Sequence, residues 1–102
     1  MITILTTVEV QPGREADLEE LYRQARRERD HYPGLRTSRL LRDTDQQGRY
    51  VVYDEWDDRA QFDAFVRASG MLWLLDATDH WIAPPHWSFF EDVEDVEPAR
   101  AS

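Results

Sequence analysis

A single acidic residue in the middle of the chain is the first candidate for acid–base chemistry. Asp54 alternates with Tyr50, Val52 and Trp56, so its side of the predicted strand is otherwise apolar and aromatic. A carboxylate on an apolar wall loses much of the solvation of its charged form, which suits it to exchange a proton with a substrate near neutral pH. We therefore expect Asp54 to act as a catalytic base. The alternative is a solvated carboxylate near the end of a strand, or one paired with an arginine.

Two histidines on either side of a rigid double proline are further candidates. His80 and His86 each precede a tryptophan, and Pro84 and Pro85 stand between them. Imidazole titrates near neutral pH, so either histidine could serve as a general base or as a hydrogen-bond donor to a phenolic substrate. A surface or packing role is the alternative for each. We expect His80 in the catalytic group and His86 in the binding wall.

Aromatic side chains that could bind a flat molecule recur along the chain. The indole of Trp56 could stack on such a molecule and donate its N–H to a carbonyl or peroxide oxygen, although it could also simply fill the space between a sheet and a helix. Residues that alternate with it, Tyr50 and Asp54, should share its face of the strand. The other aromatic residues expected around the substrate are Tyr22, Phe62, Phe65 and Trp73.

The composition excludes several other kinds of site. The chain has no cysteine, which rules out disulfides, thiolate nucleophiles, thiolate-ligated haem and iron–sulfur clusters. Asp76, Asp79, His80 and His86 offer atoms that bind metals, but their spacing matches no recognised metal motif, so no metal site is predicted. The net charge of -9 repels phosphate backbones and anionic lipid headgroups, which argues against nucleic acid and membrane partners.

Length and termini indicate one small domain. The chain has 102 residues, and we expect residues 1–93 to form a single domain and the acidic residues 94–102 to fray. The first ten residues alternate in polarity and resemble neither a signal peptide nor a membrane span, so a cytoplasmic location is expected. A domain of this size gains stability when two copies pair through an apolar sheet face.

The residues above are expected on six elements of an α+β fold. Alternation of β-branched with other residues predicts strands, and a stripe of apolar residues predicts each helix. In chain order these are a strand over 2–10, a helix over about 15–31, strands over 35–42 and 49–56, a helix capped by Asp57 or Asp58 with a second short helix over 71–75, and a strand over 86–91. The order β-α-β-β-α-β is typical of a ferredoxin-like, four-stranded antiparallel sheet with both helices on one face.

The strand over 49–56 is apolar or aromatic on both of its sides. One side is expected to contact the helices and the other a second subunit. The predicted architecture is therefore a homodimeric α/β barrel.

Three short motifs resemble the antibiotic biosynthesis monooxygenase family. They are Gln11-Pro12-Gly13-Arg14-Glu15 before the first helix, Tyr32-Pro33-Gly34 after it, and Tyr53-Asp54-Glu55-Trp56-Asp57 at the end of the third strand. The resemblance covers roughly Ile2 to Ser69. It implies a homodimer with a pocket between the sheet and helices of each subunit, and oxidation of aromatic substrates by O2 without metal or flavin.

The expected function is thus a cofactor-independent monooxygenase that acts on a phenolic, anthrone or quinol-type, polyketide-like small molecule. A polyketide cyclase without redox chemistry and a non-catalytic, small-molecule-binding dimer are the alternatives. The aromatic-polyketide oxygenases carry an asparagine and a tyrosine where this chain has Val52 and Phe62. The haem-degrading branch carries an asparagine, a tryptophan and a histidine where this chain has Thr6, Phe65 and Leu75, so haem is not expected as a cofactor.

Overall fold

The computed structural model describes residues 1–29, 32–68 and 82–93. The elements follow the predicted order: β1 (Ile2–Glu9), α1 (Glu15–Arg29), β2 (Leu35–Arg42), β3 (Arg49–Trp56), α2 (Arg59–Arg67) and β4 (His86–Glu91). The bounds of β2, β3 and β4 are those predicted. The first strand is one residue shorter than expected, because Val10 forms only an isolated bridge to Ile82. The short helix predicted over 71–75 lies outside the described residues.

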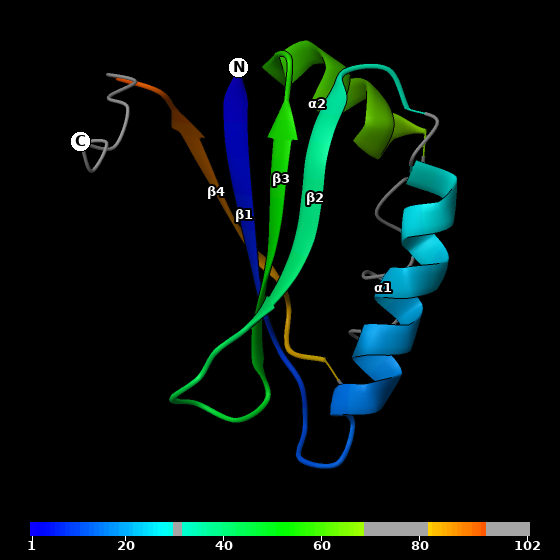
Figure 1. Ribbon diagram of the computed structural model, residues 1–102, viewed down its shortest axis with the longest axis vertical. Helices are drawn as coiled ribbons and strands as arrows, with labels where there is room; N and C mark the ends of the chain where they lie inside the picture. Colours follow the sequence, from blue (N-terminus) through cyan, green and yellow to red (C-terminus); the bar gives the residue numbers. More distant parts are fainter. Residues whose placement is uncertain (30–31, 69–81, 94–102) are drawn as a thin grey trace, which may run out of the picture.

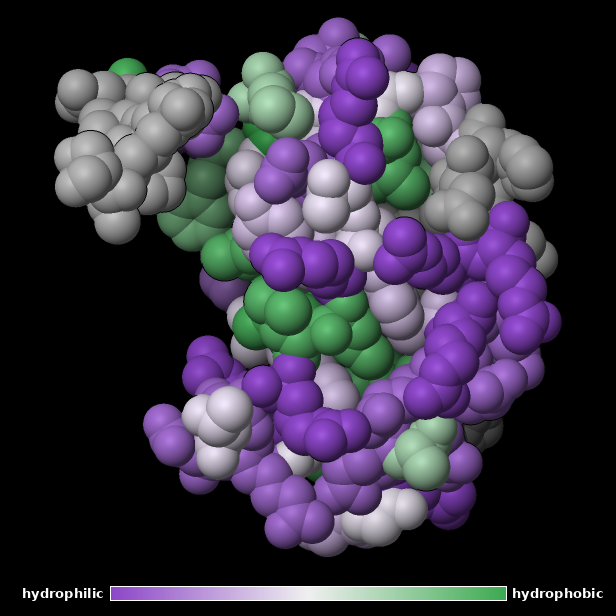
Figure 2. Space-filling model, in the orientation of Figure 1, coloured by the Kyte–Doolittle hydropathy of each residue, from purple (hydrophilic) through white to green (hydrophobic). Residues whose placement is uncertain are grey.

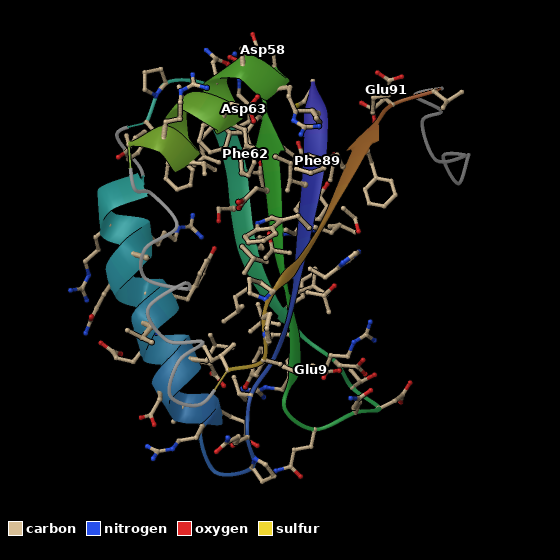
Figure 3. All side chains as sticks on the ribbon, turned by 180° about the vertical axis from the view of Figure 1, so that it is seen from behind. Glu9, Asp58, Phe62, Asp63, Phe89 and Glu91 are labelled. Atoms are coloured by element: carbon tan, nitrogen blue, oxygen red, sulfur yellow. The ribbon has the colours of Figure 1, made fainter. Side chains whose placement is uncertain are left out.

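The four strands form one antiparallel sheet in the order β2-β3-β1-β4 (Figure 1). In Figure 1 the sheet is seen from its open face, with α2 behind the strands, and in Figure 3 from the side that carries the helices. The fold is the ferredoxin-like α+β arrangement predicted from the sequence. Neither described helix has the length and apolar character needed to span a membrane.

Strand β3 shows how the alternating sequence sets the two faces of the sheet. Tyr50, Val52, Asp54 and Trp56 are buried, whereas the residues between them are partly exposed. The Trp56 ring lies 5.9 Å from Phe62 and 5.2 Å from Phe65, centroid to centroid, so this buried face packs against α2. Large aromatic side chains dominate the energetics of such a core, since each removes about 150–250 Å² from water.

The opposite face of the sheet carries a band of apolar side chains that neither of the two described helices covers. Cross-strand pairing places Leu5 opposite Tyr53 and Leu41 opposite Val51 on this face. Leu41 is 39% exposed, and Phe90, on the same face of β4, is 50% exposed. Figure 2 shows hydrophobic side chains gathered near the middle of this face and framed by hydrophilic ones.

The start of α2 is fixed by a side-chain cap. Asp58 has an extended backbone, and its carboxylate accepts a 2.9 Å hydrogen bond from the main-chain N–H of Gln61. Of the two predicted caps, Asp58 is therefore the one used. Asp57 binds Arg36 instead, through two hydrogen bonds of 2.5 and 3.1 Å. The cap sets the point at which the chain leaves β3 and begins to cover Trp56.

Candidate functional site

A small group of polar side chains is buried on the helix-covered face of the sheet. Asp54 is 2% exposed, Ser38 4% and Thr6 1%. Ser38 is the direct neighbour of Asp54 across β2 and β3, and Thr6 pairs with Val52 on the other side of β3. The carboxyl group predicted to exchange a proton therefore lies inside the molecule with hydroxyl-bearing residues on both neighbouring strands. It does not lie at a solvated strand end.

Helix α1 contributes one residue to this group. Tyr22 is 6% exposed, and its hydroxyl is hydrogen-bonded to the Ser38 hydroxyl at 2.6 Å. The inner stripe of α1 brings Tyr22 over β2, because residues three and four apart lie on one face of a helix. We call this group the buried polar cluster, and its members are Thr6, Tyr22, Ser38 and Asp54.

Trp56 adds a hydrogen-bond donor close to α2. Its side chain is fully buried, and its indole Nε1 has no hydrogen-bond partner within the described parts of the chain. Leaving such a group unpaired costs about 1–3 kcal/mol. A buried N–H of this kind is suited to donate to an oxygen atom of a bound molecule.

An apolar pocket of about 360 Å³ lies between α2 and β4. Its lining residues are Phe62, Asp63, Val66, Arg67, Trp87 and Phe89. The rings of Phe62 and Phe89 meet edge to face at 5.7 Å, and the Arg59 guanidinium lies 3.7 Å above the Phe89 ring. Figure 3 shows Phe62 and Phe89 side by side beneath Asp63. Aromatic walls of this kind suit a flat, hydrophobic ligand.

The pocket and the buried polar cluster lie on the same face of the sheet. Phe62 lines the pocket and also contacts Trp56. Phe89, Ile4 and Asp54 form one row across β4, β1 and β3. Phe62 therefore lies between the pocket and the ring of Trp56.

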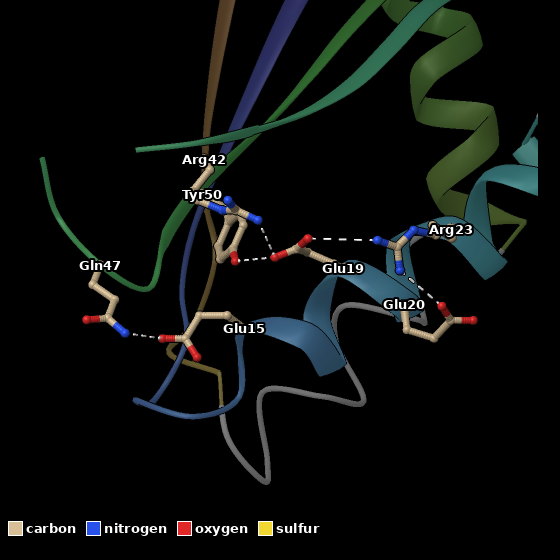
Figure 4. A network of polar contacts seen from close by, with 7 residues as sticks. All are labelled: Glu15, Glu19, Glu20, Arg23, Arg42, Gln47 and Tyr50. Carbon is tan, nitrogen blue, oxygen red and sulfur yellow. Dashed lines mark hydrogen bonds and ion pairs between the residues drawn. The ribbon is translucent and has the colours of Figure 1, made fainter. Parts of the chain in front are cut away.

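Tyr50 is buried on the predicted face, but its hydroxyl takes part in a different group of contacts. It donates a 2.7 Å hydrogen bond to Glu19, which also accepts a 2.9 Å hydrogen bond from Arg42 (Figure 4). These bonds, that from Tyr50 first, lower the pKa of Glu19. Burial, followed by the bond to Glu19, raises the pKa of Tyr50. The ring of Tyr50 belongs to the core, and its hydroxyl stabilises the contact between α1 and β3.

The structure does not bring every predicted site residue together. Five of them are buried between the sheet and the helices: Tyr22, Asp54, Trp56, Phe62 and Phe65. His86 is exposed and pairs with Thr7, which puts it on the open face of the sheet, away from the others. The reason is the period of two in β4, where Trp87 turns inward and its neighbour must turn outward.

Two of the predicted residues, His80 and Trp73, lie outside the described residues, as do Asp76 and Asp79. Within the described ranges, no three His, Asp or Glu side chains gather closely enough to hold a metal ion.

Several residues of the site were not predicted. Ser38 could have been found from alternation in β2, which turns Ser38, Leu40 and Arg42 to one side. Trp87 required the register of β4, which the sequence does not specify. Its indole Nε1 is buried without a hydrogen-bond partner among the described residues, as in Trp56.

Comparisons with known proteins agree with the observed fold. Residues 1–73 match the family model for antibiotic biosynthesis monooxygenases. No curated protein matches the chain.

Solved structures share the fold over nearly the whole chain. A protein from Deinococcus radiodurans superposes with a TM-score of 0.86 at 17% identity, covering 98% of this chain and 100% of that one. SnoaB, a cofactor-independent oxygenase from Streptomyces nogalater, gives a TM-score of 0.80 at 21% identity, with 95% and 97% covered. A protein from Bordetella bronchiseptica gives 0.76 at 26% identity, with 91% and 97% covered.

Proposed function

Because the chain belongs to the antibiotic biosynthesis monooxygenase family, we propose that it oxidises an aromatic small molecule with O2 and needs no metal or flavin. The substrate class is a phenolic, anthrone or quinol-type molecule of polyketide-like shape. The observation that carries this proposal is the burial of Asp54 on the sheet face that also forms an aromatic-walled pocket. The cofactor-independent oxygenase SnoaB shares the fold, which supports the same reaction class.

The proposed reaction begins with removal of a proton. Asp54 takes a proton from the bound substrate, which leaves an electron-rich carbanion on the aromatic system. The carbanion reduces O2 and a carbon–oxygen bond forms. Loss of the second C–H proton breaks the O–O bond of the resulting peroxide, so a CH2 group of an anthrone becomes a carbonyl and the outer oxygen leaves with both protons as water. Asp54 returns its proton to the oxygen that leaves.

Trp56 and the pocket have separate roles in this proposal. The indole N–H of Trp56 donates a hydrogen bond to the oxygen that gains negative charge, and a donor aimed at such an atom contributes strongly to catalysis. Phe62, Trp87 and Phe89 hold the flat ring system and exclude water from it. Val52 and Phe62 are apolar, so the proton transfer relies on Asp54 together with the hydroxyls of the buried polar cluster.

A second copy of the chain is proposed to cover the open face of the sheet. The apolar band with Leu41 and Phe90 supports this assembly, because burying exposed apolar surface is the main favourable term in association. His86 would then lie at or near the contact between the two copies.

One observation favours a second candidate function on the same fold. The apolar residues Val52 and Phe62 stand where the aromatic-polyketide oxygenases have polar ones. A polyketide cyclase requires acid–base groups and a shaped pocket but no oxygen, and this site offers both.

Assays with and without oxygen test the proposal and separate the two functions. Chelator-treated protein is incubated with anthrone and quinol substrates in air-saturated and in anaerobic buffer. Turnover that requires O2 supports the oxygenase, and turnover that persists without O2 supports the cyclase. No turnover above buffer in either condition rejects both catalytic functions and leaves a binding protein.

A further inference from the structure

A second pocket, of about 290 Å³, lies at the edge strand β2 and has a quite different lining. Its residues are Arg26, Leu35, Arg36, Thr37, Ser38 and Arg39. None of these six is acidic, although the whole chain carries 21 acidic residues against 12 basic ones. The aromatic pocket shares no lining residue with it.

An irregularity in β2 helps to build this pocket. Leu35 pairs with Trp56, whereas Thr37 pairs with Glu55, so Arg36 is an extra residue in the ladder between them. Such a bulge bends a strand and redirects its side chains, and bulges are frequent at sheet edges. The consecutive residues Leu35, Arg36 and Thr37 all line the pocket as a result.

Each of the three guanidinium groups is held by a contact from another element. Arg26 donates a 2.7 Å hydrogen bond to the main-chain oxygen of Ser38. Arg36 binds Asp57 at 2.5 and 3.1 Å. The Arg39 guanidinium lies 5.0 Å above the ring of Tyr53, a contact that orients the group without neutralising its charge. The arginines are therefore partly ordered before any ligand arrives.

The donors in this pocket match one chemical class of ligand. A guanidinium presents five N–H donors in a planar fork that fits carboxylate and phosphate oxygens, and the hydroxyl of Thr37 adds a further donor. The Arg36–Asp57 pair has side chains 64% and 38% exposed, so solvent weakens it and an incoming anion can compete for Arg36.

We propose that the β2-edge pocket binds an oxyanion group, a carboxylate or a phosphate, carried by a small molecule. This site is separate from the aromatic pocket and does not depend on the proposed oxygenase reaction.

Nuclear magnetic resonance titration of the full chain tests this proposal. Inorganic phosphate and, separately, succinate are added at constant ionic strength set with potassium chloride. The amide signals of residues 35–39 should shift and saturate with one of the two anions. Tighter binding of phosphate identifies a phosphate-bearing ligand, and tighter binding of succinate identifies a carboxylate-bearing one.

Variants separate a built site from general charge attraction. Arg39→Ala and Arg36→Ala should each weaken binding about tenfold or more, since each removes a charged fork. Arg39→Lys keeps the charge and the fold but loses the fork, so it should weaken binding less than Arg39→Ala does. Arg23→Ala removes the same charge from α1, where the side chain pairs with Glu19 and Glu20, and should leave binding within about twofold.

Two results would overturn the proposal. In one, neither anion produces saturable shifts at residues 35–39. In the other, Arg39→Ala, Arg39→Lys and Arg23→Ala all bind with the same affinity as the unchanged chain.

Discussion

The hydroxyl of Tyr50 donates a 2.7 Å hydrogen bond to the carboxylate of Glu19, and this bond joins the buried face of β3 to the first half of α1. It is the largest cause of the lowered pKa of Glu19. The folded chain therefore binds the Glu19 proton less readily than the unfolded chain does. The resulting stabilisation is present above the ordinary glutamate pKa of about 4.3 and is lost as the pH falls through the lowered folded-state value.

We expect Tyr50→Phe to make the unfolding free energy depend less steeply on pH below about 4.3, because the main cause of the shift is removed. Urea denaturation midpoints between pH 3 and 7 measure this dependence. Tyr53→Phe is the matched control, since the Tyr53 hydroxyl bonds Glu55 and not Glu19. Identical acid profiles for the unchanged chain and Tyr50→Phe would contradict the assigned role of this hydrogen bond.

Two glycines with similar backbone angles should respond very differently to alanine. Gly13 and Gly48 have φ values of 89° and 84°, which strain any residue with a Cβ atom. A Cβ at Gly48 would lie 2.8 Å from the main-chain oxygen of Val10, whereas a Cβ at Gly13 would have no atom of the described residues within 4 Å. Gly13→Ala should cost about 1 kcal/mol, and Gly48→Ala at least about twice as much. Chemical denaturation of both variants gives the difference in unfolding free energy. Equal losses of unfolding free energy would show that the main chain at Val10 moves away from the new Cβ atom at little cost.

Trp56→Phe separates the packing of this residue from its N–H group. The smaller ring loses buried area but also removes a donor that has no partner among the described residues, so the stability loss should stay near 1–2 kcal/mol. Turnover of an anthrone substrate should fall about tenfold or more if the N–H stabilises the developing oxygen charge. Parallel denaturation and kinetic measurements decide the point. A loss of stability with unchanged kcat would leave Trp56 with a packing role alone.

Leu41→Glu tests the proposed assembly of two copies. Leu41 is 39% exposed on the open face, so a charge there should cost the isolated subunit less than about 0.5 kcal/mol while weakening a contact formed over that face. Sedimentation velocity should show a dimer for the unchanged chain and a shift toward monomer for the variant. Gln24→Glu, on exposed α1, is the control for added charge. A monomeric unchanged chain would remove this part of the proposal.

The predictable part of the fold rests on patterns that depend on neighbours along the chain. The alternation from Tyr50 to Trp56 placed four side chains on the buried face, and the structure confirms it. Pro33 and Gly34 predicted that the first helix ends before them, and α1 does end before this pair. Such signals are local, because a strand turns alternate residues to opposite sides whatever it pairs with.

The parts that could not be predicted depend on pairing between distant segments. His86 and Trp87 are neighbours of similar amphipathic character, so either one could face inward, and only the register with Thr7 and Thr6 decides which does. Glu19 is one of several acids on α1, and its partner Tyr50 lies 31 residues further along the chain. No feature of the helix sequence alone distinguishes it.

The central claim is that Asp54 acts as the base in an oxygen-dependent oxidation. Oxygen uptake with an anthrone substrate, measured for the unchanged chain, Asp54→Asn and Asp45→Asn, tests it most directly. Asp45 is exposed in the turn between β2 and β3, away from the aromatic pocket, and supplies the matched loss of a carboxylate. We expect uptake above buffer for the unchanged chain, a loss of about a hundredfold or more in Asp54→Asn, and little change in Asp45→Asn. Absence of uptake by the unchanged chain, or full activity of Asp54→Asn, would contradict it.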